Sequence, residues 1–136
     1  MGRPRPTLRR PDPGEETLTA ERCHIVETWN RADDPELSVA RARVAPGVIT
    51  RWHRLQGIAE RYLIVSGQGL AEVEGTEPAA VQAGDLLYIP AGHAQRIRNT
   101  GSEDLLFYAL CTPRFRWAAY QDLDGAANSP QGGSEP

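Results

Sequence analysis

The central part of the chain consists of short apolar segments, and glycine or proline interrupts them every few residues. Residues 37–44 alternate Val39, Arg41 and Arg43 with alanines and a valine, which is the period of two that a pleated strand requires. No interval of this region shows helical spacing over a useful length. Many short strands with close, regular turns predict an all-β antiparallel sandwich or barrel, whose interior is expected to be a small-molecule cavity.

The expected strands are separated by recognisable turn residues. They lie within residues 22–30, 37–44, 60–75 (two strands around Gly67 and Gly69), 83–92 and 94–112 (two strands around Asn99-Thr-Gly101). The chain length of 136 residues is that of one domain.

The two ends of the chain differ from this region in composition. Residues 1–17 combine prolines and charges with almost no large apolar side chains, so they predict a flexible N-terminal tail. Residues 125–136 are rich in glycine, serine and proline and predict a second tail. The domain between them, residues 18–124, is expected to be a barrel that ends in a flap formed by residues 112–124.

Charge and cysteine content limit the classes of function. The net charge is −3, so neither nucleic acid nor an anionic membrane is the expected partner. All 15 basic residues are arginine, which excludes Schiff-base chemistry and a lysine general base. Cys23 and Cys111 lie far apart and no apolar secretory segment precedes them, so buried reduced thiols in a soluble cytoplasmic protein are predicted.

Two separated motifs carry a family resemblance. Gly47, His53, Glu60 and Gly67 fall at the spacing of the first cupin motif, G-x5-H-x-H-x3,4-E-x6-G. Residues 84–99 follow the second, G-x5-P-x-G-x2-H-x3-N, with Gly84, Pro90, Gly92 and Asn99 in place. The chain therefore resembles a small single-domain cupin over about residues 36–112. This resemblance implies a double-stranded β-helix, or jelly-roll barrel, that is commonly a homodimer.

The resemblance also implies a metal site, and here the sequence departs from the family. The four ligand positions of cupins are occupied by His53, Leu55, Glu60 and Gln95, so leucine and glutamine replace two histidines. Leucine cannot bind a metal, whereas glutamine offers a neutral amide oxygen. The prediction is a divalent transition metal (Fe, Mn, Ni or Zn) held by His53, Glu60 and Gln95. The alternative is a hydrogen-bonded pair of Glu60 and His53 in a metal-free pocket.

Strand alternation gives an independent expectation for the same residues. If His53 points into the barrel, so does Leu55, and Glu60 shares its face with Tyr62. A carboxylate buried in such a cavity requires protonation, an ion pair or a metal. Glu60 and Tyr62 are therefore the candidate catalytic residues, as acid or base and as proton carrier.

His93 gives an alternative ligand set, because it lies two residues before Gln95. Turned inward, it would complete two imidazoles and one carboxylate, a set suited to non-haem iron. A surface position in the Pro-Gly turn is the competing expectation. Aromatic residues that could wall the pocket or pack in the core are Trp52, Tyr62, Tyr88, Trp117 and Tyr120.

The function expected from these features is a small cupin that binds an oxygenated small molecule and acts on it by Lewis-acid chemistry, as an isomerase, cyclase or lyase. A non-catalytic small-molecule-binding cupin is the alternative from another class. A non-haem iron dioxygenase is a further alternative, which the missing histidine at position 55 disfavours.

Overall fold

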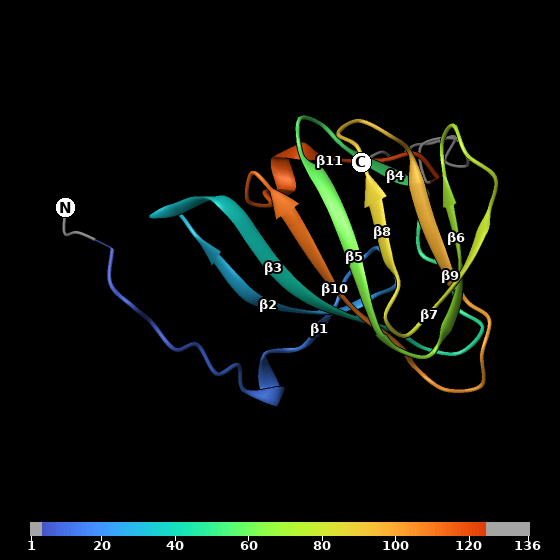
Figure 1. The fold of residues 1–136 in the computed structure, drawn as a ribbon, viewed down its shortest axis with the longest axis horizontal. Helices are drawn as coiled ribbons and strands as arrows, with labels where there is room; N and C mark the ends of the chain where they lie inside the picture. Colours follow the sequence, from blue (N-terminus) through green and yellow to red (C-terminus); the bar gives the residue numbers. More distant parts are fainter. Residues whose placement is uncertain (1–3, 125–136) are drawn as a thin grey trace.

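The computed structural model describes residues 4–124 and consists of two antiparallel sheets packed face to face (Figure 1). The six-stranded sheet has the order β1 (Thr17–Leu18), β2 (His24–Arg31), β3 (Asp34–Val44), β10 (Leu105–Thr112), β5 (Ala59–Ser66) and β8 (Leu86–Ile89). The five-stranded sheet has the order β11 (Tyr120–Asp122), β4 (His53–Leu55), β9 (Gln95–Asn99), β6 (Gln68–Val73) and β7 (Ala79–Gln82). Single-turn 3-10 helices occur at η1 (Pro13–Glu15) and η2 (Trp117–Ala119).

This architecture confirms the predicted all-β fold, a jelly-roll barrel built from short strands. Both sheets contribute to one apolar core, with Ile64 and Phe107 from the larger sheet and Ala71 and Ile97 from the smaller. In β10, buried and partly exposed residues alternate along the whole strand. That alternation leaves one face of the sheet on the core and the other face outside.

Asn99 explains why the end of β9 is fixed. Its buried side-chain amide donates hydrogen bonds to the carbonyl oxygens of Val44 and Glu103, at 2.8 and 2.7 Å, and its Oδ1 accepts from the backbone N–H of Gly101 at 2.8 Å. One side chain thus joins β3, β9 and the turn before β10, because an amide supplies both donors and an acceptor.

The expected flap packs on the barrel. After β10 the chain passes through Phe115 and η2, and then enters β11, which pairs with β4 at the edge of the smaller sheet. A second small core, formed by Leu55, Ile58, Cys111 and Ala119, lies beneath this segment. The flap therefore closes one end of the barrel rather than standing free.

The domain boundaries stay predictions, but ordered structure begins before residue 18. Within the expected tail, residues 13–15 form η1 and Thr17 belongs to β1. The Arg9 side chain also donates to the backbone oxygens of Glu27 and Thr28 on β2, both at 2.9 Å. The second expected tail, residues 125–136, lies outside the described residues.

Candidate functional site

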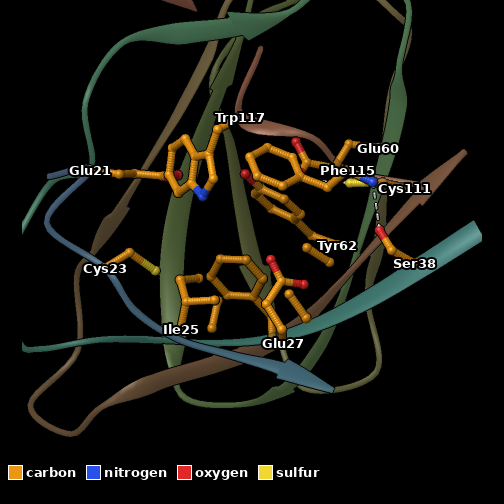
Figure 2. A pocket seen from close by; sticks show the side chains of 14 residues that line it. Glu21, Cys23, Ile25, Glu27, Ser38, Glu60, Tyr62, Cys111, Phe115 and Trp117 are labelled. Carbon is orange, nitrogen blue, oxygen red and sulfur yellow. Dashed lines mark hydrogen bonds between the residues drawn. The ribbon is translucent and has the colours of Figure 1, made fainter. Parts of the chain in front are cut away.

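A cavity lies against the inner face of the six-stranded sheet (Figure 2). It contains about 510 Å³ of empty space, part of which is open to solvent. Strands β2, β3, β5 and β10 form the floor, while Phe115 and Trp117 of the flap form the roof. The lining residues that matter below are Glu21, Cys23, Glu27, Glu60, Tyr62, Cys111, Phe115 and Trp117.

A buried chain of hydrogen bonds supports Glu60, which lies on β5. The Tyr62 hydroxyl donates to Gln95 Oε1 at 2.6 Å, and Gln95 Nε2 donates to Glu60 Oε1 at 2.8 Å. The parity of β5 aims Glu60 and Tyr62 to the same side, and Gln95 reaches them from β9 in the opposite sheet. Because both ends of the Gln95 amide are engaged, its orientation and that of the Glu60 carboxyl are fixed.

The second carboxyl oxygen of Glu60, Oε2, makes a weaker contact than Oε1. Among the described residues, the Cys111 thiol is the group that contacts this oxygen, with Sγ 3.7 Å from Oε2. Burial raises the pKa of Glu60, since its side chain is withdrawn from water, while His53 lowers it and Glu21 raises it further. Burial likewise holds the pKa of the Cys111 thiol and of the Tyr62 hydroxyl above their usual values, so both groups stay protonated at neutral pH.

His53 is buried beside this chain, with a side chain 2 % exposed. Its Nδ1 lies 2.7 Å from the carbonyl oxygen of Arg51. A carbonyl only accepts, so Nδ1 carries a proton, and Nε2 is the ring nitrogen that faces Glu21. Tyr120 of β11 stacks on the ring, with centroids 5.0 Å apart, and holds its plane.

Glu21 faces His53 from the loop before β2. Its Oε2 lies 3.7 Å from His53 Nε2, close enough for an ion pair and too long for a direct hydrogen bond. The Glu21 side chain is 16 % exposed, and its burial raises the pKa of the carboxyl to about 7. A carboxyl that titrates near neutral pH, beside an imidazole, can either give or take a proton under physiological conditions.

The predicted inward positions are all buried: His53, Leu55, Glu60, Tyr62 and Gln95. Glu60 and Tyr62 line the cavity itself, whereas His53 and Gln95 lie behind its wall. His93 is half-buried, with Nδ1 3.5 Å from the carbonyl oxygen of Ala91 in its own turn, and it is not among the lining residues. The turn before β9 thus breaks the alternation that would have aimed His93 inward.

Of the aromatic candidates, Tyr62 and Trp117 line the cavity. Tyr88 is exposed on the outer face, and Trp52 packs against the Arg96 guanidinium with 5.3 Å from Cζ to the ring centroid. Sequence reasoning missed Glu21, Glu27 and Phe115. The signal available for Glu27 was its position within the segment predicted as a strand, whereas Glu21 and Phe115 lie in loops that no periodicity constrains.

The described side chains do not fit the predicted metal centre. In residues 4–124 no three side chains of histidine, cysteine, aspartate or glutamate come together in a group that could hold a metal ion. The third predicted ligand, Gln95, directs its amide oxygen at the Tyr62 hydroxyl and its amide nitrogen at Glu60. A metal held by His53, Glu60 and Gln95 would therefore require the Gln95 amide oxygen to leave the Tyr62 hydroxyl.

Comparison with known proteins agrees with the fold and the motifs. Residues 40–111 match the model of the cupin domain. The chain belongs to the cupin family. This confirms the resemblance that the two sequence motifs indicated.

The proteins similar to this cupin have different functions in their names. An oxalate-binding protein of Thermotoga maritima is 34 % identical over 71 residues, an alignment that covers 52 % of this chain and 58 % of the relative. The chain thus spans less than two thirds of that curated relative. A crystal structure described as a predicted oxalate decarboxylase of the same organism has 26 % identity and a TM-score of 0.61, covering 67 % of this chain and 80 % of the other.

A third similar structure is a nucleoside dehydratase, Pac13, from Streptomyces. Its TM-score is 0.70 over 86 % of this chain and 92 % of the other, with 18 % identity, so the likeness concerns the fold. No helix among the described residues is long and apolar enough to cross a bilayer.

Proposed function

We propose that this cupin binds a hydroxylated small molecule in its barrel cavity and acts on it by proton transfer, as a lyase or isomerase. The observation that supports this most is the hydrogen-bonded chain from Tyr62 through Gln95 to Glu60. It holds one oxygen of a buried carboxyl, while the other oxygen has, among the described residues, only the Cys111 thiol 3.7 Å away, which is the arrangement of a positioned general base.

In this proposal Glu60 removes a proton from carbon through Oε2. Gln95 and Tyr62 are positioning residues, because the Tyr62 proton is already directed at the Gln95 amide and the high pKa of the phenol prevents it from acting as a base. Glu21, which lines the cavity, supplies the complementary proton to the departing or rearranging oxygen, and the buried His53 ring, 3.7 Å from its carboxyl, is a positioning residue. Loss of a C–H proton to Glu60 and protonation of the leaving hydroxyl by Glu21 together release one water molecule and form a double bond.

The divalent metal and the Lewis-acid role expected from the sequence form the competing account of this site. When bound, a metal would polarise a substrate oxygen. No step above depends on it, because the amide of Gln95 is committed to hydrogen bonds and Leu55 offers no donor. The dioxygenase alternative requires a second imidazole beside His53 and Glu60, and none is grouped with them among the described residues.

The charged groups of the cavity indicate which of the similar proteins could share its type of ligand. Its lining contains Glu21, Glu27 and Glu60, and no arginine or histidine among the described residues. A dianion such as oxalate would meet carboxyl groups and no cationic side chain there, unless a metal intervened. The elimination of water named for the structurally similar dehydratase matches the acid and base groups better, although that likeness concerns the fold alone.

Non-catalytic binding remains a second candidate, and one observation favours it. Burial keeps the pKa values of Cys23, Cys111 and Tyr62 high, so none of these three lining groups is a nucleophile at neutral pH. Such a lining suits a protein that binds its ligand without changing it.

The deciding experiment incubates metal-free protein in D₂O with a panel of hydroxylated aldehydes, ketones and nucleosides. Deuterium entering a C–H position, or loss of water, is followed by NMR and mass spectrometry. We expect turnover of at least one class by wild type, a loss of at least about 100-fold in Glu60→Gln, and a smaller loss in Tyr62→Phe. Binding without exchange by wild type would support the binding protein instead, and exchange that persists in Glu60→Gln would contradict the assignment of the base.

A further inference from the structure

The cavity brings together three carboxylates from separate parts of the chain. Glu21 comes from the loop before β2, Glu27 from β2 and Glu60 from β5. Figure 2 shows them approaching from different sides of the same space. None of the described residues that line it carries a guanidinium or an imidazole.

This lack of arginine is specific to the cavity. Elsewhere the fold pairs its partly buried carboxylates with arginine, as in Arg43 with Glu16 at 2.7 Å and Arg96 with Glu72 at 3.0 Å. Arg51 and Asp122 form a similar pair at 3.0 Å. The chain contains 15 arginines, and these pair with carboxylates outside the cavity rather than with those that line it.

The partners of the cavity carboxylates leave their charge largely uncompensated. Glu60 receives an amide N–H on Oε1, but Oε2 has no N–H or O–H donor among the described residues. Glu27 receives a long amide contact from Asn30 at 3.4 Å. Among the described residues, the Glu21 carboxyl has only the imidazole of His53 as a charged partner, 3.7 Å away. Glu27 is exposed at the edge of the cavity, whereas Glu21 and Glu60 are largely withdrawn from water. An ionised carboxylate at either of these two positions is costly without a cation, so a ligand that supplies one gains affinity.

Aromatic rings complete the other walls. Phe115 and Trp117 meet edge to face, with centroids 4.9 Å apart and planes at 85°, and form a corner over the cavity. Tyr62 lies on the floor, tilted against Phe107 at 4.3 Å. Trp117 is 55 % exposed, so its ring lies at the opening. Ring faces attract cations, and carboxylates around an aromatic corner make the attraction selective for positive charge.

We propose that the cavity binds an organic cation, a small molecule with a quaternary or protonated amine beside its hydroxyl group. The ammonium lies between the carboxylates and the rings of Phe115 and Trp117, while the hydroxyl faces Glu60. This inference rests on the proposed function, because it names the class of molecule that the same cavity takes. It adds a requirement for positive charge, which proton transfer alone does not demand.

Choline and 3,3-dimethyl-1-butanol test the requirement directly, because they share shape and hydroxyl group and differ in the charge of one atom. Binding is measured calorimetrically at pH 8 in low salt, with chelator present to remove divalent ions. We expect choline to bind at least about tenfold more tightly than the neutral alcohol. Glu27→Gln should reduce choline affinity severalfold, whereas Glu77→Gln, the same change at an exposed turn outside the cavity, should leave it unchanged.

Three outcomes overturn the inference. Equal or tighter binding of the neutral alcohol removes the role of charge but leaves the proton-transfer proposal standing, because that proposal is decided by deuterium exchange. Absence of millimolar binding by both compounds rejects the organic cation as the ligand class. Choline binding that Glu27→Gln and Glu77→Gln weaken alike would reflect net charge rather than the cavity.

Discussion

At the scale of single residues, the site depends on which group each buried polar atom faces. Gln95 takes the place of a histidine ligand of cupins, and its amide bridges Tyr62 and Glu60. The sequence predicted that Gln95 lies inside, which follows from strand parity. It did not predict the orientation of the amide, because that depends on a hydroxyl and a carboxyl brought from another sheet.

Gln95→His provides a prediction about this position. The Cα of Gln95 pairs with that of His53, so an imidazole there would join His53 and Glu60 as a third ligand. We expect affinity for Ni²⁺ and Zn²⁺ to rise by at least about 100-fold over wild type, because imidazole binds these ions much better than an amide. Titration calorimetry measures it, with Gln56→His as an exposed control. Equal affinity of Gln95→His and wild type would show that position 95 does not face a metal-competent space.

Glu21→Gln tests the buried carboxyl through the pH dependence of stability. An unfolded glutamate ionises near pH 4.3, whereas burial raises the pKa of Glu21 to about 7 in the fold. Between these values the unfolded chain has lost the proton and the folded chain keeps it, so the contribution of this group to stability falls as pH rises from about 4.3 to 7 and then levels off.

Glutamine does not ionise, so the Glu21→Gln variant does not lose this stability as the pH rises. We expect Glu21→Gln to gain about 1–3 kcal/mol over wild type between pH 4.5 and 8, measured by urea unfolding at fixed pH. The Glu77→Gln variant changes charge equally at an exposed site and should run parallel to wild type. A constant difference between Glu21→Gln and wild type across this range would contradict the raised pKa.

At the scale of elements, the longer alternating segments were predictable and the short ones were not. Strands β6, β8, β9 and β10 fall within segments predicted as strands, and β2, β3 and β5 extend one to three residues beyond theirs. Strands β1, β4, β7 and β11, which were not predicted, have four residues or fewer, too few for a period of two to stand out. Strand β8 also has four residues, but Gly84 and Pro90 on either side of it marked its ends. Their pairing is decided by neighbouring strands, as β11 shows by joining β4 after the flap has crossed the barrel.

The turn between β5 and β6 gives a prediction at this scale. Gly67 has φ +91°, and a Cβ there would lie 2.5 Å from the Asp104 carbonyl oxygen and 2.8 Å from Leu105 Cα. Gly75 also has φ +91°, but a Cβ there meets nothing within 4 Å. We expect Gly75→Ala to cost about 1 kcal/mol of unfolding free energy and Gly67→Ala at least about 2 kcal/mol more. Equal losses in denaturant unfolding would mean that the backbone approach at Gly67 relaxes freely.

At the scale of the whole molecule, the outer face of β5 and β8 is the surface most relevant to the predicted homodimer. Leu63 lies opposite Leu86 in the register of these strands, and Tyr88 lies opposite Arg61. Leu63, Leu86 and Tyr88 are exposed, together with Val65 on the same strand face. Clustered apolar side chains of this kind are typical of interaction surfaces.

Leu63→Arg with Leu86→Glu tests that prediction. We expect wild type to sediment as a dimer and the double variant as a folded monomer, because burying either charge at a symmetric interface is unfavourable. Leu18→Glu alters a leucine of similar exposure on β1 and should leave the dimer intact. A monomeric wild type at micromolar concentration would contradict the homodimer itself.

The family and the barrel were predictable from motif spacing, whereas the chemistry of the cavity depended on residues that the motifs do not include. Glu21, Glu27 and Phe115 reach the cavity from a loop, an early strand and the flap. No local pattern relates them, because tertiary packing alone makes them neighbours. The charge of the cavity, which distinguishes anionic from neutral or cationic ligands, therefore became visible only in the folded molecule.

The central claim is that Glu60 works as a proton-transfer group held by Gln95 and Tyr62, rather than as a ligand of a resident metal. Metal analysis of protein purified without chelator tests this most directly. The account predicts substoichiometric transition metal, unchanged in His53→Ala and Glu60→Ala. A stoichiometric metal ion in wild type that is lost in both variants would contradict it.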